Sequence, residues 1–234
     1  MPELKAMKRM LKNAAALTAG ALLNKAMFFI FTVLLARKMG AEGLGLWVFL
    51  FSLAMLASLV GDLGLEQLLV RDVAKRRTRL NRYLSAGIIL KVCSSMLYLV
   101  VVLFMLAFLN LTTVSRLIFL LCAVSFVLQS FTKTFNAAFR AHERMDAQTA
   151  ISLVGDVLFV SGSAFILLTG HGLVHIAAAL ACANIIQLIL AAVTCKSVCL
   201  FTLNLKRLQL KALIAESAPF MVSKILFYVY SLAG

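Results

Sequence analysis

Long apolar stretches, each crossed by polar residues at helical spacing, follow one another along the whole chain. Each stretch has at least the length of about 20 residues with which an α-helix spans the hydrocarbon core of a bilayer. Because 63% of the residues are hydrophobic, more than a soluble core can bury, the pattern predicts an all-α, polytopic membrane protein. The six complete spans that we expect lie at 14–36, 44–68, 83–109, 117–138, 149–169 and 173–195. A seventh begins near Ala218 and is incomplete at Gly234.

Residues 196–217 form a longer connection than the others. Leucines are interspersed there with Lys206, Arg207 and Lys211, which suits either a basic amphipathic helix on the cytoplasmic membrane surface or a solvated linker. We therefore expect three parts: a six-helix transmembrane lobe at 1–195, the linker at 196–217, and the start of the seventh helix at 218–234.

Basic residues are divided unevenly between the two sides of the predicted spans. Sixteen of the 23 lysines and arginines fall in the N-terminal segment and the even-numbered connections, against Arg37, Lys38 and Arg116 on the other side. The positive-inside rule then places the N-terminus in the cytoplasm. The net charge of +14 is mostly a topology signal, with some attraction to anionic membrane lipids, and it requires no nucleic-acid partner.

Lys25 lies at the centre of the first predicted span, next to Asn24. At about 1.5 Å per residue its Cα is roughly 16 Å from either end, farther than a lysine side chain reaches comfortably. An unpaired lysine at that depth costs about 2.5–3.5 kcal/mol, so such a residue is by default a hypothesis about function. The sequence predicts that Lys25 faces a hydrated or protein-lined interior.

Polar residues recur on one face of every predicted span. In the fourth span they stand three or four residues apart, at Ser125, Gln129, Lys133, Asn136 and Arg140. The ionisable groups inside or at the ends of the spans are Lys25, Lys91, Lys133 and Lys224, against Asp62, Glu66 and Asp156. Such seams favour a hydrated central cavity, although pairwise polar packing between helices is the alternative.

An excess of lysine suits an anion, because the ammonium group binds phosphate as a compact point charge. The residues that we assign to the cavity are Lys25, Lys91, Asn24, Gln129, Lys133, Asn136 and Lys224. Lys25 and Lys91 are the strongest candidates for phosphate, and the amides for sugar hydroxyls, whereas Lys133 could instead extend to the cytoplasmic surface. Asp62, Glu66 and Asp156 are candidates for ion coupling. With apolar surfaces around it, the cavity predicts a lipid-linked anionic substrate.

Other chemistry finds little support in the pattern. His171 and His175 have metal-ligand spacing but no acidic partner nearby, so we expect no metal site. The five cysteines show neither metal-ligand spacing nor the pairing of a disulfide framework, and they suit small apolar packing positions. We expect no cofactor.

Three motifs resemble the polysaccharide-export flippases (Wzx type) of the multidrug/oligosaccharidyl-lipid/polysaccharide exporter superfamily. They are ARKMGAEGLG at 36–45, DLGL at 62–65 followed by RDVA at 71–74, and FRAHERM at 139–145. In the first motif, Gly40, Gly43 and Gly45 would allow a tight turn between two spans, through positive φ or close approach. The resemblance covers the chain in order and spacing, and it points to the superfamily rather than to one substrate.

The resemblance implies two six-helix lobes around a cavity that opens alternately to each side of the bacterial cytoplasmic membrane. The substrate would be an undecaprenyl-diphosphate-linked oligosaccharide, a repeat unit of O-antigen, capsule or exopolysaccharide. On this comparison the chain supplies the first lobe and the start of the next helix, so we expect either a piece of a longer protein or a truncated product. Partners would be membrane lipids and proteins of glycan polymerisation and assembly.

Rival functions remain open from the sequence. A cation-coupled drug or metabolite antiporter of the same superfamily would use the acidic residues for coupling, and lysines outnumber acids in the spans by only four to three. A lipid II flippase would also suit the lysines. A membrane glycan polymerase or ligase would need catalytic groups on the outer side, where the predicted loops are short, so we expect a non-enzyme. An inactive scaffold is the remaining alternative.

Overall fold

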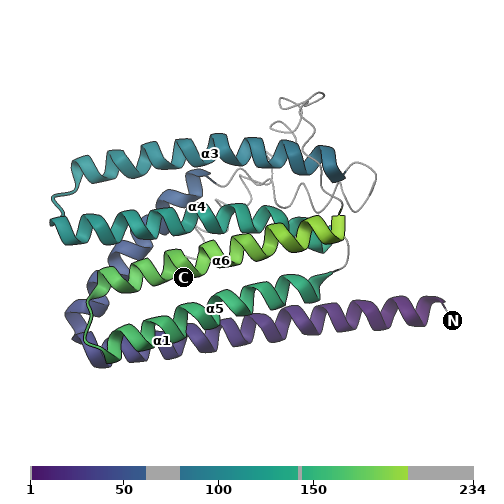
Figure 1. Cartoon of the computed structure of the whole chain (residues 1–234), viewed down its shortest axis with the longest axis horizontal. Coiled ribbons are helices and arrows are strands. Elements are labelled where there is room, and N and C mark those ends of the chain that lie inside the picture. Colours follow the sequence, from purple (N-terminus) through teal and green to yellow (C-terminus); the bar gives the residue numbers. More distant parts are fainter. Residues whose placement is uncertain (1, 62–79, 142–143, 200–234) are drawn as a thin grey trace, which may run out of the picture.

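The computed structural model describes residues 2–61, 80–141 and 144–199 (Figure 1). The helices in these ranges are α1 (Pro2–Gly61), α3 (Leu80–Phe108), α4 (Thr113–Ala141), α5 (Met145–Leu168) and α6 (Leu173–Cys199). All five contain a stretch that is long and apolar enough to cross a membrane, and no strand occurs within the three ranges. The described part of the chain is therefore all-α and has the composition of a multi-pass membrane protein.

Helix α1 is broken at Gly40. Its 60 residues would measure about 90 Å as one straight helix, three times the thickness of a hydrocarbon core. Gly40 has φ 71° and ψ −175°, a conformation that is essentially confined to glycine. After Gly40 the helix turns and runs back across the bundle at an angle (Figure 1). The turn lies between the predicted spans 14–36 and 44–68, and α1 contains the whole of the first span and residues 44–61 of the second as two segments of one broken helix.

The three glycines of the predicted turn differ in what they do. Gly40 supplies the positive φ. Gly43 supplies a close approach, because a Cβ added there would lie 2.6 Å from the Cβ of Met39. Gly45 has neither property, since nothing lies within 4 Å of an added Cβ and its φ is not positive. The expected roles therefore hold for two of the three glycines.

The helices α3 to α6 begin and end within four residues of the predicted spans 83–109, 117–138, 149–169 and 173–195. Helix α6 continues through Cys199, into the first residues of the predicted linker. The predicted end of the second span, at 62–68, lies outside the described residues, as do the rest of the linker and the start of the seventh span.

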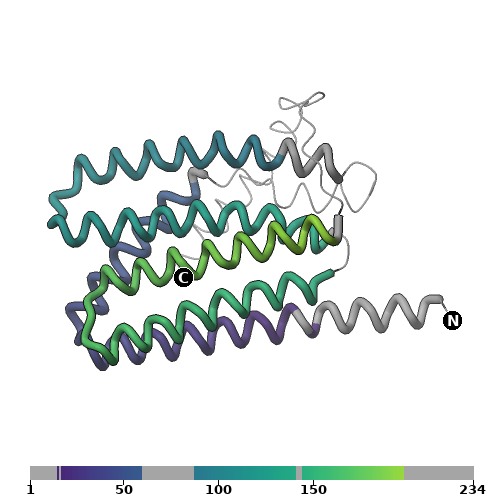
Figure 2. Tube along the Cα trace, in the orientation of Figure 1, coloured from purple at the N-terminus to yellow at the C-terminus, as the bar shows by residue number. Residues whose placement is uncertain are grey.

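The helices pack beside one another in the order α3, α4, α6, α5 and the first segment of α1 (Figure 1). Figure 2 shows the backbone of that segment, before Gly40, running beside α5 along most of the length of α5. The second segment of α1, after Gly40, also packs against α3 and α4. Helix α5 thus lies between α1 and α6.

Six aromatic rings form a continuous cluster near the Gly40 turn. We call it the aromatic cluster, and it consists of Phe28, Phe31, Trp47, Phe51, Phe126 and Phe159. Phe31 is central, with ring centroids 5.6 Å from Trp47 and 4.8 Å from Phe159. Its side chain is only 1% exposed. The cluster joins both segments of α1 to α4 and α5.

Candidate functional site

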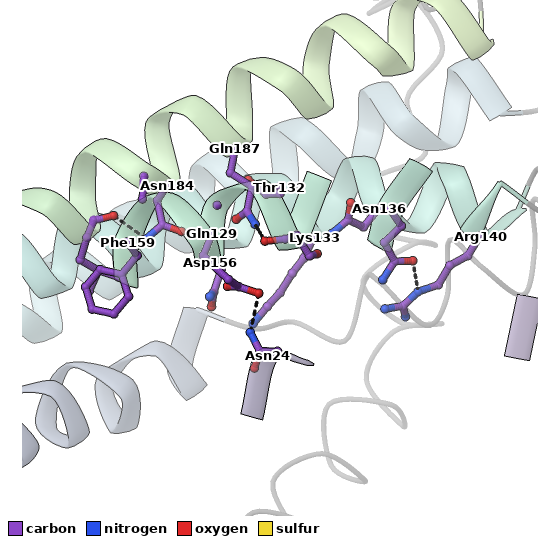
Figure 3. A pocket seen from close by; sticks show the side chains of 15 residues that line it. Asn24, Gln129, Thr132, Lys133, Asn136, Arg140, Asp156, Phe159, Asn184 and Gln187 are labelled. Atoms are coloured by element: carbon purple, nitrogen blue, oxygen red, sulfur yellow. Dashed lines mark hydrogen bonds between the residues drawn. The ribbon is translucent and has the colours of Figure 1, made fainter. Parts of the chain in front are cut away.

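A cavity of about 290 Å³ lies among α1, α4, α5 and α6, and we call it the four-helix cavity. Its lining is mostly polar and contains three of the amides predicted from the sequence. The lining residues are Asn24, Gln129, Thr132, Lys133, Asn136, Arg140, Gln148, Ser152, Gly155, Asp156, Phe159, Leu180, Ala183, Asn184 and Gln187 (Figure 3). Phe159 belongs to the aromatic cluster as well, so that cluster adjoins the cavity.

A second cavity, of about 350 Å³, lies between α1 and α5, and we call it the α1–α5 cavity. It shares Asn24, Arg140, Gln148, Ser152 and Asp156 with the four-helix cavity. The residues that it adds are Leu17, Gly20, Ala21, Lys25, Thr149 and Leu153. Because five residues line both spaces, we treat the two cavities as adjoining parts of one site.

Helical spacing accounts for the way the lining is assembled. On α4, Gln129, Lys133, Asn136 and Arg140 follow each other at steps of three or four and therefore share one face. The face of α5 that carries Gln148, Ser152 and Asp156 has the same spacing. Figure 3 shows the side chains of Gln129, Lys133 and Asp156 close to one another beside α4.

Close packing fixes α5 against both of its neighbours. A Cβ added to Gly155 would lie 2.7 Å from the Nε2 of Gln187 on α6. That Nε2 donates to the backbone carbonyls of Ile151 and Ser152 at 3.4 Å each, which holds the glutamine in place. On the other side, a Cβ added to Gly20 of α1 would lie 2.6 Å from the Cγ2 of Thr149. Glycines on α5 and α1 therefore allow the close approach.

The charges in the two cavities are unequal. Lys25, Lys133 and Arg140 line them on the positive side, and Asp156 is the one acidic residue among the described residues of the two linings. Neither lysine has a hydrogen bond or ion pair to any residue in the described ranges. The site therefore carries an excess of positive charge, which suits an anionic ligand.

Asp156 is tied to α1 by a hydrogen bond. Asn24 donates from Nδ2 to the carboxylate Oδ2 at 2.7 Å (Figure 3). The bond joins the first helix to the middle of α5, at the place where the two cavities meet. Since Lys25 follows Asn24 directly, the same contact fixes the stretch of α1 that presents the lysine.

Two buried polar atoms at the site have no hydrogen-bond partner in the described chain. One is the Oδ1 of Asn136, whose side chain is 7% exposed and lines the four-helix cavity. The other is the Oγ1 of Thr149, in the lining of the α1–α5 cavity. Buried polar groups are nearly always paired, so each atom is placed to take a partner that the described residues do not provide.

The structure brings together most of the residues that the sequence assigned to the site. Asn24, Lys25, Gln129, Lys133, Asn136 and Asp156 all line one or both cavities. Lys91 lies elsewhere: it is 6% exposed on α3, a helix that has no described side chain in either lining. Lys224, Asp62 and Glu66 lie outside the described residues.

Several lining residues were not assigned to the site from the sequence. Arg140 was interpreted only as part of a polar seam and of the topology signal, and Gln148 fell just before the predicted span 149–169. Asn184 and Gln187 are four and seven residues beyond Leu180 on the same face of α6. A helix start four residues earlier would have shown Gln148 in one register with Ser152 and Asp156.

The histidine pair lies away from both cavities. The rings of His171 and His175 are 4.8 Å apart between centroids, at the connection from α5 to α6. The hydroxyl of Thr169 contacts the Nδ1 of His171 at 2.8 Å. No group of three or more potential metal ligands occurs in the residues that the structure describes.

Comparison with known proteins gives one match. A family model described as "polysaccharide biosynthesis protein" matches residues 10–233, nearly the whole chain. No curated protein and no solved structure was found to match. The matched family agrees with the flippase-like motifs in the sequence, and the apolar helices agree with a membrane location. The chain is a multi-pass membrane protein that belongs to the polysaccharide biosynthesis protein family.

Proposed function

We propose that this protein moves a lipid-linked anionic oligosaccharide across the bacterial cytoplasmic membrane by alternating access. The observation that carries the proposal is the cationic, amide-lined pair of cavities inside a bundle of membrane-length helices. A purely structural bundle would not retain, at such depth, lysines that have no partner among the described residues.

Each part of the substrate has a matching surface. Lys25 and Lys133 suit the diphosphate, since ammonium groups attract phosphate oxygens without fixed geometry. Asn24, Gln129 and Asn136 offer amide donors and acceptors to sugar hydroxyls, and the unpaired Oδ1 of Asn136 needs a donor of that kind. The polyprenyl tail would stay in the bilayer beside the exposed apolar faces of the helices.

The orientation in the proposal follows from the basic residues. With the N-terminus in the cytoplasm, the end of the bundle at which α4 ends and α5 begins faces the cytoplasm. The substrate is assembled on that side, so the cavities would receive it there and the aromatic cluster would separate it from the outer face. Proteins that polymerise or assemble the glycan are the expected partners on the outer side.

The proposal is tested in a cell that lacks its own flippase and carries the complete native coding region, sequenced beyond Gly234. Surface polysaccharide should be restored by the native protein and lost with Lys25→Ala, because the ammonium group that attracts the diphosphate is gone. Lys38→Ala is the matched control, since Lys38 is also exposed on α1 but lines neither cavity. Equal amounts of both variants in the membrane exclude an insertion defect. Unchanged polysaccharide with Lys25→Ala would contradict the proposal.

A cation-coupled antiporter is the second candidate, and the pairing of Asp156 with Asn24 favours it. A carboxylate held inside a cavity is suited to exchange a proton or Na⁺ during transport. In proteoliposomes, Asp156→Asn would then abolish transport driven by an ion gradient. Gradient-independent flipping of the lipid-linked glycan that survives Asp156→Asn would favour the first proposal.

A further inference from the structure

Arg140 lies at the end of the bundle at which α4 ends and α5 begins. It is the next-to-last residue of α4, and it lines both cavities. Gln148, in the first turn of α5, accepts a hydrogen bond from the Nε of Arg140 to its Oε1 at 2.9 Å (Figure 3). The bond restrains the orientation of the guanidinium group, whose nitrogens lie in one plane.

Lys133 lies on the same face of α4, deeper in the bundle. It precedes Arg140 by seven residues, two helical turns, which corresponds to about 10 Å along the axis. Asn136, with its unpaired Oδ1, lies between them on that face. The face therefore presents one cation at the end of the helix, a polar group one turn inside, and a second cation after a further turn.

Lys25 provides a third cation from the opposite wall. It lines the α1–α5 cavity together with Arg140, while Lys133 lines the four-helix cavity together with Arg140. Arg140 is therefore the cation that the two cavities have in common. Asp156, the acidic residue of both linings, has its Oδ2 bound by Asn24 at 2.7 Å and lies eleven residues into α5.

We propose that Arg140, positioned by Gln148, is the entry site for a diphosphate group, which then passes to the deeper lysines Lys25 and Lys133. Entry at the end of α4 keeps the diphosphate at the depth of lipid head groups until a second cation is within reach. A planar guanidinium suits the first contact, because it can bind two phosphate oxygens at once. The flexible lysines suit the later contacts, because they can follow a moving anion.

This inference rests on the proposed function only in taking the diphosphate to belong to a membrane lipid. The same chemistry would recognise free pyrophosphate, so the experiment uses both. Full-length protein in nanodiscs is titrated with inorganic pyrophosphate, and full-length protein in proteoliposomes is given a short-chain polyprenyl diphosphate whose flipping is followed over a range of concentrations.

Arg140→Gln is expected to raise the half-saturating concentration of the polyprenyl diphosphate about tenfold, because one charge-assisted contact with the diphosphate is lost at entry. The maximal rate should stay nearly unchanged. Lys133→Gln is expected to lower the maximal rate instead. Arg140→Lys, which keeps the charge but not the planar fork, should lie between Arg140→Gln and the native protein. Arg116→Gln is the matched control, being exposed at the other end of α4 and outside both cavities.

The role of Gln148 has its own readout. Gln148→Leu should raise the half-saturating concentration, as Arg140→Gln does. The double variant should have the same half-saturating concentration as Arg140→Gln alone, because Gln148 acts only through the arginine. Gln148→Asn keeps a neutral amide acceptor on a side chain one methylene shorter and should retain more of the native value than Gln148→Leu. Additive effects in the double variant would overturn the positioning role.

The two possible failures can be told apart. If Arg140→Gln weakens pyrophosphate binding about tenfold but no polyprenyl diphosphate is flipped by the native protein, the entry site stands and the transport proposal fails. If flipping proceeds and Arg140→Gln changes neither pyrophosphate binding nor half-saturation, the entry site is wrong and the transport proposal stands. Binding of free pyrophosphate with no response to the lipid-linked form would overturn the assignment to a lipid.

Discussion

The aromatic cluster and the four-helix cavity are neighbours on the same helices, and they are built in opposite ways. On α4 the change from one to the other takes three residues, from Phe126 to Gln129, and on α5 it takes three, from Phe159 back to Asp156. The cluster fills its space with rings in mutual contact. The cavity is lined by amide and basic side chains that leave a space between them. The same helices therefore combine close packing of aromatic rings in one region with polar side chains around a cavity in the next.

The largest effect on stability is expected at the centre of the cluster. Phe31→Ala removes a buried ring that touches Trp47 and Phe159, and it should lower the free energy of unfolding in detergent by about 3–5 kcal/mol. Phe29→Ala is the control, because Phe29 is 68% exposed on the same helix. If both variants melt at the same temperature, the cluster does not stabilise the lobe.

The packing of α5 against α6 should give the next largest effect. Gly155→Ala forces a methyl group against Gln187 and should lower stability by about 1–3 kcal/mol. Gly162→Ala on the same helix is the control, since its added Cβ would be 3.8 Å from the nearest side chain. Shortening the partner, in the double variant Gly155→Ala with Gln187→Ala, should recover much of the loss. A double variant that is less stable than Gly155→Ala alone would argue against the contact.

The turn that closes the aromatic end should be sensitive to a single methyl group. Gly40→Ala introduces a side chain at φ 71° and should lower stability by about 1–2 kcal/mol, measured by thermal unfolding. Gly45→Ala is the control: the position is helical and has space, so it should be neutral or stabilising by up to about 1 kcal/mol. Equal effects at the two positions would mean that the break in α1 does not depend on glycine.

The smallest effect on stability is expected inside the cavity. Asn136→Leu replaces a buried acceptor that lacks a partner, so unfolding should change by less than about 0.5 kcal/mol or shift towards greater stability. Surface polysaccharide should nevertheless fall in the complementation assay. Thr134→Val is the control, because Thr134 is buried on the same helix, donates to the carbonyl of Ser130, and lines neither cavity. A marked loss of stability with Asn136→Leu would show that the amide is structural.

Several features of the fold and of the candidate site could be predicted from the sequence. Helix length and polar periodicity depend on local spacing, so the bounds of α3 to α6 and the shared face of Gln129, Lys133 and Asn136 followed from the residues alone. The turn at Gly40 could be predicted because glycine tolerates a backbone that other residues avoid.

The remaining features depend on which helices meet. Periodicity shows that Lys91 lies on the polar face of its helix, but not that α3 lies apart from both cavities. The hydrogen bond between Asn24 and Asp156 joins polar faces of two helices, and the sequence does not indicate which polar faces will meet. Gln148 was missed because a hydropathy boundary four residues too late excluded it from α5.

The hydrogen bond between Asn24 and Asp156 also constrains how the chain is made. The two residues are 132 positions apart, and at about 5–20 residues per second the second is synthesised roughly 7–26 s after the first. During that interval α1 has already emerged from the ribosome, and Asn24 and Lys25 must stay hydrated or be sheltered by the insertion machinery. Membrane insertion of α1 is therefore expected to be completed late, when α5 arrives to pair with it.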